Sequence, residues 1–254
     1  MKTIAYPGSV YHWIIALILP LVFGLAPTQA AGKVDNAIYA ELLSRYVKAG
    51  VVDYQGLKTE EDRLDAYLAE LAKVAPDDLP REARFAFYIN AYNAWTLKLI
   101  LTGYPGVESI KDLGTLFASP WKKKIARIDG KTLTLDQIEH DILRPEFKDA
   151  RVHFAINCAA LSCPPLRSEP YDAHRLDSQL TEATVDFINR GDRNYLQGAT
   201  LYLSRIFKWF NGDFTPDVVE FVRQYAAGEL KKSLSESKKV KVDYLDYDWS
   251  LNGK

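Results

Sequence analysis

An apolar stretch between Pro80 and Gly103 constrains the fold more than any other feature of this chain. Its hydrophobic side chains cover nearly the whole circumference of a helix instead of one stripe, and a helix of this kind is buried among other elements. Asn90 and Asn93 are its polar exceptions, three residues apart and therefore on one face. Because an unpaired buried amide costs about 1–3 kcal/mol, these side chains either brace a neighbouring loop, which we favour, or point into a site.

The segment after residue 124 predicts a hairpin followed by a short helix. Asp129 and Gly130 separate two short runs, and this dipeptide is typical of the positive φ angles of a tight hairpin turn. Thr134 and Gln137 have the spacing of a capping box, which opens a helix. We expect that helix to end before Pro145, because the residue before a proline disfavours the helical conformation.

The stretch "RVHFAINCAALSCPPL", residues 151–166, contains both cysteines of the chain. Every second residue from 152 to 156 is apolar, and this period of two predicts a strand. On a regular strand His153 and Cys158 face opposite sides, so only a bend near Asn157 would bring them together. The two prolines that follow predict a loop.

The remaining segments complete a mixed fold. Amphipathic helical patterns precede and follow the central helix, and alternating runs near residues 201–206 and 239–249 predict further strands. Several helices around a small, mainly antiparallel sheet make an α+β fold. We expect residues 31–254 to form a single globular domain.

Residues 1–30 predict a secretory signal peptide. Lys2 is the only charge before Lys33, and an apolar run over residues 13–23 leads to small residues at the predicted cleavage site near Ala30. The run is shorter than the ~20 apolar residues that span a bilayer, which disfavours an uncleaved anchor. We therefore expect a periplasmic or secreted protein that has no membrane span after cleavage.

The charge of the chain gives no preference for nucleic acid. Its 32 Lys and Arg residues are balanced by 33 Asp and Glu residues, whereas phosphate binding needs clustered positive charge. The lysine run over residues 122–124 is better explained as a solvated loop. We expect no nucleic-acid partner.

The two cysteines allow several interpretations. An exported protein with two cysteines most simply joins them, here as a Cys158–Cys163 disulfide. A redox-active pair is disfavoured because the spacing is C-x4-C and no thioredoxin-like pattern surrounds it. Zinc held by His140, His153 and both cysteines is disfavoured because the spacings match no standard finger. No metal and no cofactor are predicted.

A nucleophilic Cys158 is the alternative that implies an enzyme. It requires His153 or His140 as a base within hydrogen-bond reach, and Asp213 to orient that histidine, although bracing its own aromatic turn is the favoured role of Asp213. Asn157 or Asn90 would hold a developing oxyanion. Further binding candidates are Asn93, Glu139, Cys163 and Trp209.

Several motifs in order resemble one family. They are "FAFYINAYNAWTLKLIL", "YPGVESIKDL", "LTLDQIEHDILRP", "RVHFAINCAALSCPPL" and "LSRIFKWFNGDF". Between about Arg84 and Phe214 the chain resembles the family catalogued as domain of unknown function 547. The resemblance implies a widespread module, often secreted in bacteria and attached to signalling modules elsewhere, and it implies no established activity.

The order of the motifs is also similar to that of papain-like and transglutaminase-like hydrolases. In those enzymes a cysteine starts a buried helix and a histidine lies on a following strand; here the helix from Arg81 is followed by His153 and then Asp213. The central helix contains no cysteine, so either Cys158 supplies the nucleophile from another place or the chain is a non-catalytic relative. A likeness of fold does not assign a function.

Two functional hypotheses follow. The first is a cysteine-dependent hydrolase or acyl transferase of the cell envelope, with Cys158 as nucleophile. The second is a non-enzymatic envelope module that binds a peptide or glycan and has a structural Cys158–Cys163 disulfide. Both expect the residues around His140, the 153–163 segment and the turn at Asp213 to converge.

Overall fold

The computed structural model describes residues 1–3, 8, 34–115, 118–237 and 239–253. The apolar run and the cleavage site of the predicted signal peptide lie outside the described residues. Among the residues that are described, no helix is long and apolar enough to cross a membrane.

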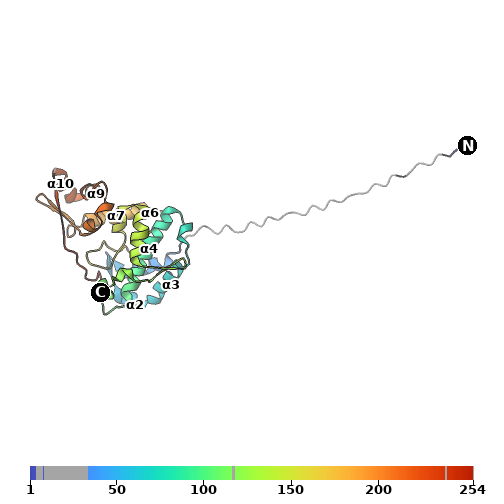
Figure 1. Ribbon diagram of the computed structural model, residues 1–254, viewed down its shortest axis with the longest axis horizontal. Helices are drawn as coiled ribbons and strands as arrows, with labels where there is room; N and C mark the ends of the chain where they lie inside the picture. The colour runs from blue at the N-terminus through green and yellow to red at the C-terminus, as the bar shows by residue number, and fades with distance from the viewer. Residues whose placement is uncertain (4–7, 9–33, 116–117, 238, 254) are drawn as a thin grey trace. The chain divides into compact units, whose positions relative to one another are not determined.

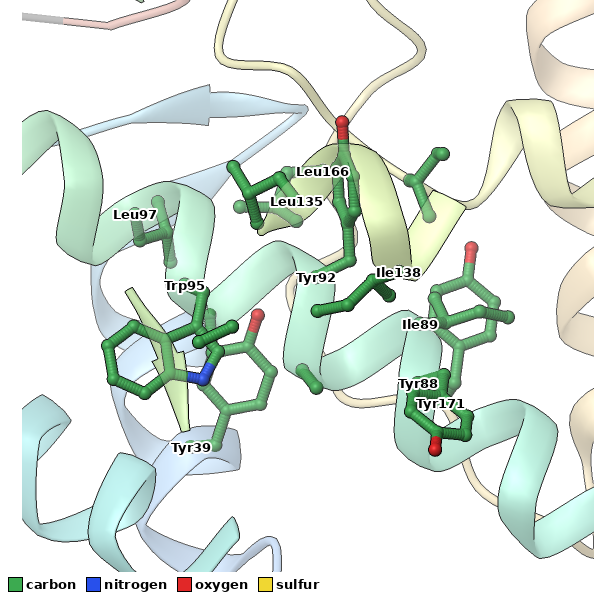
Figure 2. Packing of buried hydrophobic residues seen from close by; sticks show 14 of the residues in the cluster. Tyr39, Tyr88, Ile89, Tyr92, Trp95, Leu97, Leu135, Ile138, Leu166 and Tyr171 are labelled. Atoms are coloured by element: carbon green, nitrogen blue, oxygen red, sulfur yellow. The ribbon is translucent and has the colours of Figure 1, made fainter. Parts of the chain in front are cut away.

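The predicted buried helix is confirmed as α4 (Arg81–Leu101), which runs through the middle of the part formed by residues 34–253 (Figure 1). Every residue from Phe85 to Leu97 is buried. Tyr88, Tyr92 and Trp95 leave α4 in different directions, and Tyr92 extends toward the helical segment that follows the hairpin (Figure 2). Because neighbours cover α4 on every side, its sequence needs no polar stripe.

Shorter helices surround α4. The α-helices are α1 (Ala37–Tyr46), α2 (Tyr54–Thr59), α3 (Glu61–Leu71), α5 (Leu135–Gln137), α6 (Arg144–Phe147), α7 (Leu176–Ile188), α8 (Ile206–Trp209), α9 (Val218–Tyr225) and α10 (Gly228–Glu236). Short 3₁₀ segments of the described chain are η1 (Pro76–Asp78), η2 (Ile110–Leu113), η3 (Pro120–Lys122), η5 (Ala150–Phe154) and η6 (Asn211–Asp213), and η4 (Ile138–Leu143) is a wider π-helical turn.

In the part of the chain that the structure describes, the strands form three small sheets instead of one. They are β1 (Val47–Lys48) with β2 (Val51–Val52), β3 (Ala126–Ile128) with β4 (Lys131–Leu133), and β5 (Tyr195–Gln197), β6 (Thr200–Leu203) and β7 (Lys241–Tyr244). All pairs are antiparallel except β6 with β7. The predicted α+β fold with mainly antiparallel pairing is confirmed.

The hairpin and its capping box are confirmed. Asp129 and Gly130 have φ angles of 47° and 67° and connect β3 to β4. Thr134 accepts a hydrogen bond from the Gln137 backbone, and the Gln137 side chain accepts one from the Thr134 backbone. The sequence predicts the turn and the capping box correctly because the residues that form each of them are at most three positions apart.

The predicted end of this helix before Pro145 is wrong. The chain stays helical through η4 and α6 to Phe147. Pro145 lies in the first turn of α6, a position where proline is common. The wide turn of η4 precedes the proline, so the helical segment continues past it.

The predicted strand at residues 152–156 is also wrong. Residues 150–154 form η5, which begins where the Asp149 carboxylate accepts a hydrogen bond from the Arg151 backbone. The residues of both alternating sets are buried, His153 included. The alternation of apolar residues at positions 152, 154 and 156 therefore does not indicate a strand with one buried face, because η5 is enclosed by the protein on both sides.

Two hydrophobic clusters meet at η5. Val152 and Ile156 belong to the cluster around α4, whereas Phe154 belongs to a second, aromatic cluster. The Phe154 ring centroid lies 5.3–6.1 Å from those of Phe187, Phe207, Phe214 and Phe221. Since η5 contributes to both clusters, the backbone around His153 is fixed from two sides.

Candidate functional site

The residues around His140, the 153–163 segment and the aromatic turn that leads to Asp213 converge on one pocket of about 190 Å³. Glu139 and His140 reach it from η4, His153 from η5, and both cysteines from the following loop. Its other lining residues are Tyr92, Ser119, Trp121, Asp136, Ile156, Pro164, Ile206, Trp209, Phe210, Tyr247 and Trp249. Walls of aromatic and aliphatic side chains with a few polar groups are typical of ligand pockets.

One wall of the pocket is a cluster of three aromatic rings. The ring centroid of Tyr247 lies 4.8 Å from that of Trp209 and 4.5 Å from that of Trp249. Trp209 is nevertheless 44% exposed, a large area for a tryptophan in a folded protein. An exposed ring held by two neighbours is preorganised for stacking against a ligand.

His153 is held in one orientation. Its Nε2 lies 2.7 Å from Asp213 Oδ2, and its ring stacks on Phe210 with the centroids 4.0 Å apart. Burial lowers the pKa of His153 below its ordinary 6.5, which favours the neutral ring. Since a carboxylate only accepts hydrogen bonds, Nε2 carries the proton and Nδ1 is left as an acceptor.

Asp213 links this histidine to Arg144. The Arg144 guanidinium donates from Nε at 2.6 Å and from Nη2 at 3.0 Å to the two Asp213 oxygens. The hydrogen bond from His153, followed by those from Arg144, lowers the pKa of Asp213 well below its ordinary value. Arg144 Nη1 also lies 2.8 Å from His140 Nδ1. Because a guanidinium only donates, His140 Nδ1 is the acceptor.

Replacing Asp213 by Asn should lower the free energy of unfolding at pH 7 by about 1–2 kcal/mol, because Arg144 and His153 lose a charged acceptor at a site that solvent still screens. The lowered pKa of Asp213 means that its stabilisation is complete above its ordinary pKa of 3.8 and is lost as the pH falls further. Urea unfolding of both proteins at pH 7 and pH 2.5 measures this. A difference of equal size at the two pH values would contradict it.

Glu139 is a carboxyl group buried in the wall of the pocket. It is 8% exposed, and the Tyr92 hydroxyl lies 3.4 Å from its Oε2. Burial raises the pKa of Glu139 from 4.5 to about 7. At neutral pH the group is therefore divided between a neutral donor and a charged acceptor, a property common among groups of functional sites.

The cysteines are joined in the Cys158–Cys163 disulfide that the sequence predicted. Asn157 holds the start of this loop by donating from Nδ2 to the Pro164 carbonyl and accepting at Oδ1 from the Ala159 backbone. Both bonds are local to the loop. The Asn157 amide therefore faces the loop backbone, and Asn157 does not line the pocket.

The C-terminal segment fastens the same loop from outside. The Leu161 N–H donates to the Ser250 carbonyl, the Ser162 N–H donates to the Asp248 carbonyl, and Ala160 forms an isolated bridge with Leu251. This crossing brings Tyr247 and Trp249 to the pocket. Residues far apart in sequence thus build one wall.

Asn90 and Asn93 brace neighbouring loops, as favoured from the sequence. Asn90 donates to the Tyr171 carbonyl and accepts from the Tyr171 N–H, both at 2.8 Å. Asn93 donates to the Ala155 carbonyl at 3.0 Å and accepts from the Asn157 N–H at 2.8 Å. Neither side chain lines the pocket.

Several residues of the site are not predicted from the sequence. Arg144 holds Asp213 without lining the pocket, and its only signal in the sequence is its position four residues after His140, the spacing of neighbours on a helix. Tyr92 was read as part of an apolar helix, and Tyr247 and Trp249 as part of a closing strand. For Tyr92, Tyr247 and Trp249 the sequence contains no pattern that indicates a common site, because only the folded chain brings them together.

Among the described residues, no group of three or more His, Cys, Asp or Glu side chains is arranged to hold a metal ion. The two cysteines of the disfavoured zinc set are engaged with each other. His140 Nε2 lies 3.7 Å from Asp136.

Comparison with known proteins finds a family match over part of the chain. Residues 76–188 match the family described as "Protein of unknown function, DUF547", which confirms the predicted resemblance over this region. The motif at residues 203–214 lies beyond the match. No curated protein and no solved structure matches the chain, so the papain-like or transglutaminase-like order of the motifs stays a prediction.

Proposed function

We propose that this chain, whose residues 76–188 match the DUF547 family, is an exported module of the cell envelope that binds a peptide or glycan in its aromatic pocket. The exposed Trp209 carries this proposal, because Tyr247 and Trp249 hold its ring beside polar groups in a concave site. The pocket volume of about 190 Å³ suits one ring or one large side chain of such a ligand. Export, partners and ligand class are all part of the proposal.

The disulfide supports binding over nucleophilic catalysis. With Cys158 bonded to Cys163, neither sulfur is a thiolate, and only a thiolate is a nucleophile. The bond closes the loop that forms one wall of the pocket. The polar groups Glu139 and His153 then fix the orientation of a ligand.

The first test is to titrate the purified protein with short peptides and with oligosaccharides by calorimetry. Trp209→Ala is expected to weaken binding about 30-fold, the effect of removing an aromatic anchor at the centre of an interface. Val51→Ala is the matched control, because Val51 is 51% exposed and lies outside the pocket. Replacing both cysteines by serine should retain binding. Equal binding by Trp209→Ala and the unaltered protein would refute the proposal.

A cysteine-dependent hydrolase or acyl transferase is the second candidate. One observation favours it: Cys158, His140 and His153 line the same pocket, and Asp213 orients His153. This activity requires the disulfide to open. Alkylation of the denatured protein with and without prior reduction distinguishes the candidates, because two alkyl groups added without reduction would support the nucleophile, and addition only after reduction supports the binding module.

A further inference from the structure

The Cys158–Cys163 disulfide lies in the wall of the pocket, and its two sulfurs differ in exposure. Both cysteines line the pocket, but they differ in surroundings: Cys163 is 7% exposed, whereas Cys158 is only half-buried. A thiol that enters the pocket therefore reaches Cys158 more readily. Exposure of one sulfur is the first requirement of exchange.

The second observation is a pair of hydrogen-bond donors at the other sulfur. The backbone N–H of Cys158 points at Cys163 Sγ at 2.9 Å, and the Tyr247 hydroxyl donates to the same sulfur at 3.2 Å while lying 3.4 Å from Cys158 Sγ. Burial raises the pKa of Tyr247 above its ordinary value, so the hydroxyl keeps its proton at neutral pH. The two donors are placed where negative charge develops if Cys163 becomes a thiolate.

We propose that the Cys158–Cys163 disulfide undergoes thiol–disulfide exchange with a dithiol that enters the pocket, with Cys158 as the attacked sulfur and Cys163 as the leaving thiolate. This activity is additional to ligand binding and does not depend on the identity of that ligand. The spacing C-x4-C disfavoured a redox role when only sequence was considered. The arrangement of Tyr247, which reaches the site from a distant segment, is what carries the role here.

The exchange is balanced without another oxidant. The first thiolate of the dithiol forms a bond to Cys158 Sγ, the Cys158–Cys163 bond breaks, and its electron pair stays on Cys163. The second thiolate then attacks the sulfur of the dithiol that is bound to Cys158, releases Cys158 as a thiolate and leaves as a cyclic or peptide disulfide. The dithiol is oxidised, the protein disulfide is reduced, and both cysteine thiolates take protons from solvent.

The first experiment locates the attacked sulfur in the unaltered full chain. The native protein is mixed with reduced glutathione, quenched with acid and alkylated, and its peptides are analysed by mass spectrometry. We expect glutathione on Cys158 and the alkyl group on Cys163. Glutathione chiefly on Cys163, or a disulfide that reacts only after unfolding, would overturn the proposal.

The second experiment tests the leaving-group donor. Tyr247→Phe keeps the ring and removes the hydroxyl, so the rate of exchange should fall about tenfold, the effect of losing one hydrogen bond to a charged group. Tyr244→Phe, a half-buried tyrosine outside the pocket, is the matched control and should exchange at the unaltered rate. Equal rates for Tyr247→Phe and the unaltered protein, with circular dichroism showing both folded, would overturn the role of this hydroxyl. Ligand binding measured in parallel is a separate readout, so failure of exchange and failure of the binding function are distinguishable.

Discussion

Replacing Asn93 by leucine is expected to lower the free energy of unfolding by about 2–5 kcal/mol. The substitution leaves the Ala155 carbonyl and the Asn157 N–H without their partners inside the core, and each buried group left unpaired costs about 1–3 kcal/mol. Urea unfolding at pH 7 measures the change. Asn211→Leu is the matched control, since Asn211 is exposed, and it should change the stability little.

A second variant distinguishes an effect on the pocket from a general loss of stability. Asn90 makes the same pair of bonds to Tyr171, away from the pocket, so Asn90→Leu should destabilise the protein to a similar extent. Asn93→Leu should also weaken ligand binding by the folded protein and Asn90→Leu should not, because Asn93, unlike Asn90, holds the backbone between His153 and Cys158. Equal loss of binding in both variants would show that general loosening of the fold, and not this local brace, sets the pocket.

Replacing Glu139 by glutamine should stabilise the protein at pH 8 by about 3 kcal/mol, which is the shift of its pKa converted to free energy. Burial raises the pKa of Glu139 from 4.5 to about 7, so between these values the folded protein holds a proton that the unfolded chain has released. The stability of the unaltered protein is therefore highest with respect to this group below pH 4.5 and falls as the pH rises through 7. Glutamine keeps the shape and carries no charge, so the variant avoids that fall.

The measurement is urea unfolding of both proteins at pH 4.5, 6, 7 and 8. The two curves should agree at pH 4.5 and separate as the pH increases. Glu236→Gln, at an exposed position at the end of α10, is the control and should follow the unaltered protein throughout. A gain for Glu139→Gln that is the same at every pH would mean that a cause other than its titration is at work.

Elements with local signals were predicted well from the sequence. The circumference of α4, the Asp129-Gly130 turn and the Thr134–Gln137 capping box depend on residues that are close in the chain, so their patterns are complete within a short window. The amides of α4 were also interpreted correctly, because a polar group in a buried helix must find a partner. The sequence did not indicate which backbone groups would be the hydrogen-bond partners of these amides.

The strand predicted at residues 152–156 failed for the opposite reason. A period of two shows that alternate residues are apolar, but it does not show whether a neighbouring strand is there to pair with them. In the folded chain the Asp149 cap and two hydrophobic clusters fix this segment as η5. The argument that separated His153 from Cys158 failed with it, and both line the pocket.

The sequence by itself thus determined the central helix, the α+β class, the resemblance to one family over part of the chain and the motifs that meet at the site. Only the tertiary structure decided how those motifs are connected: Arg144 and His153 share Asp213, and the C-terminal segment brings Tyr247 to the disulfide. The physical reason is the separation along the chain between the residues that interact. Helical periodicity, turns and caps are set by neighbours in the chain, whereas burial, a raised carboxyl pKa and hydrogen-bond partners depend on residues that meet only after folding.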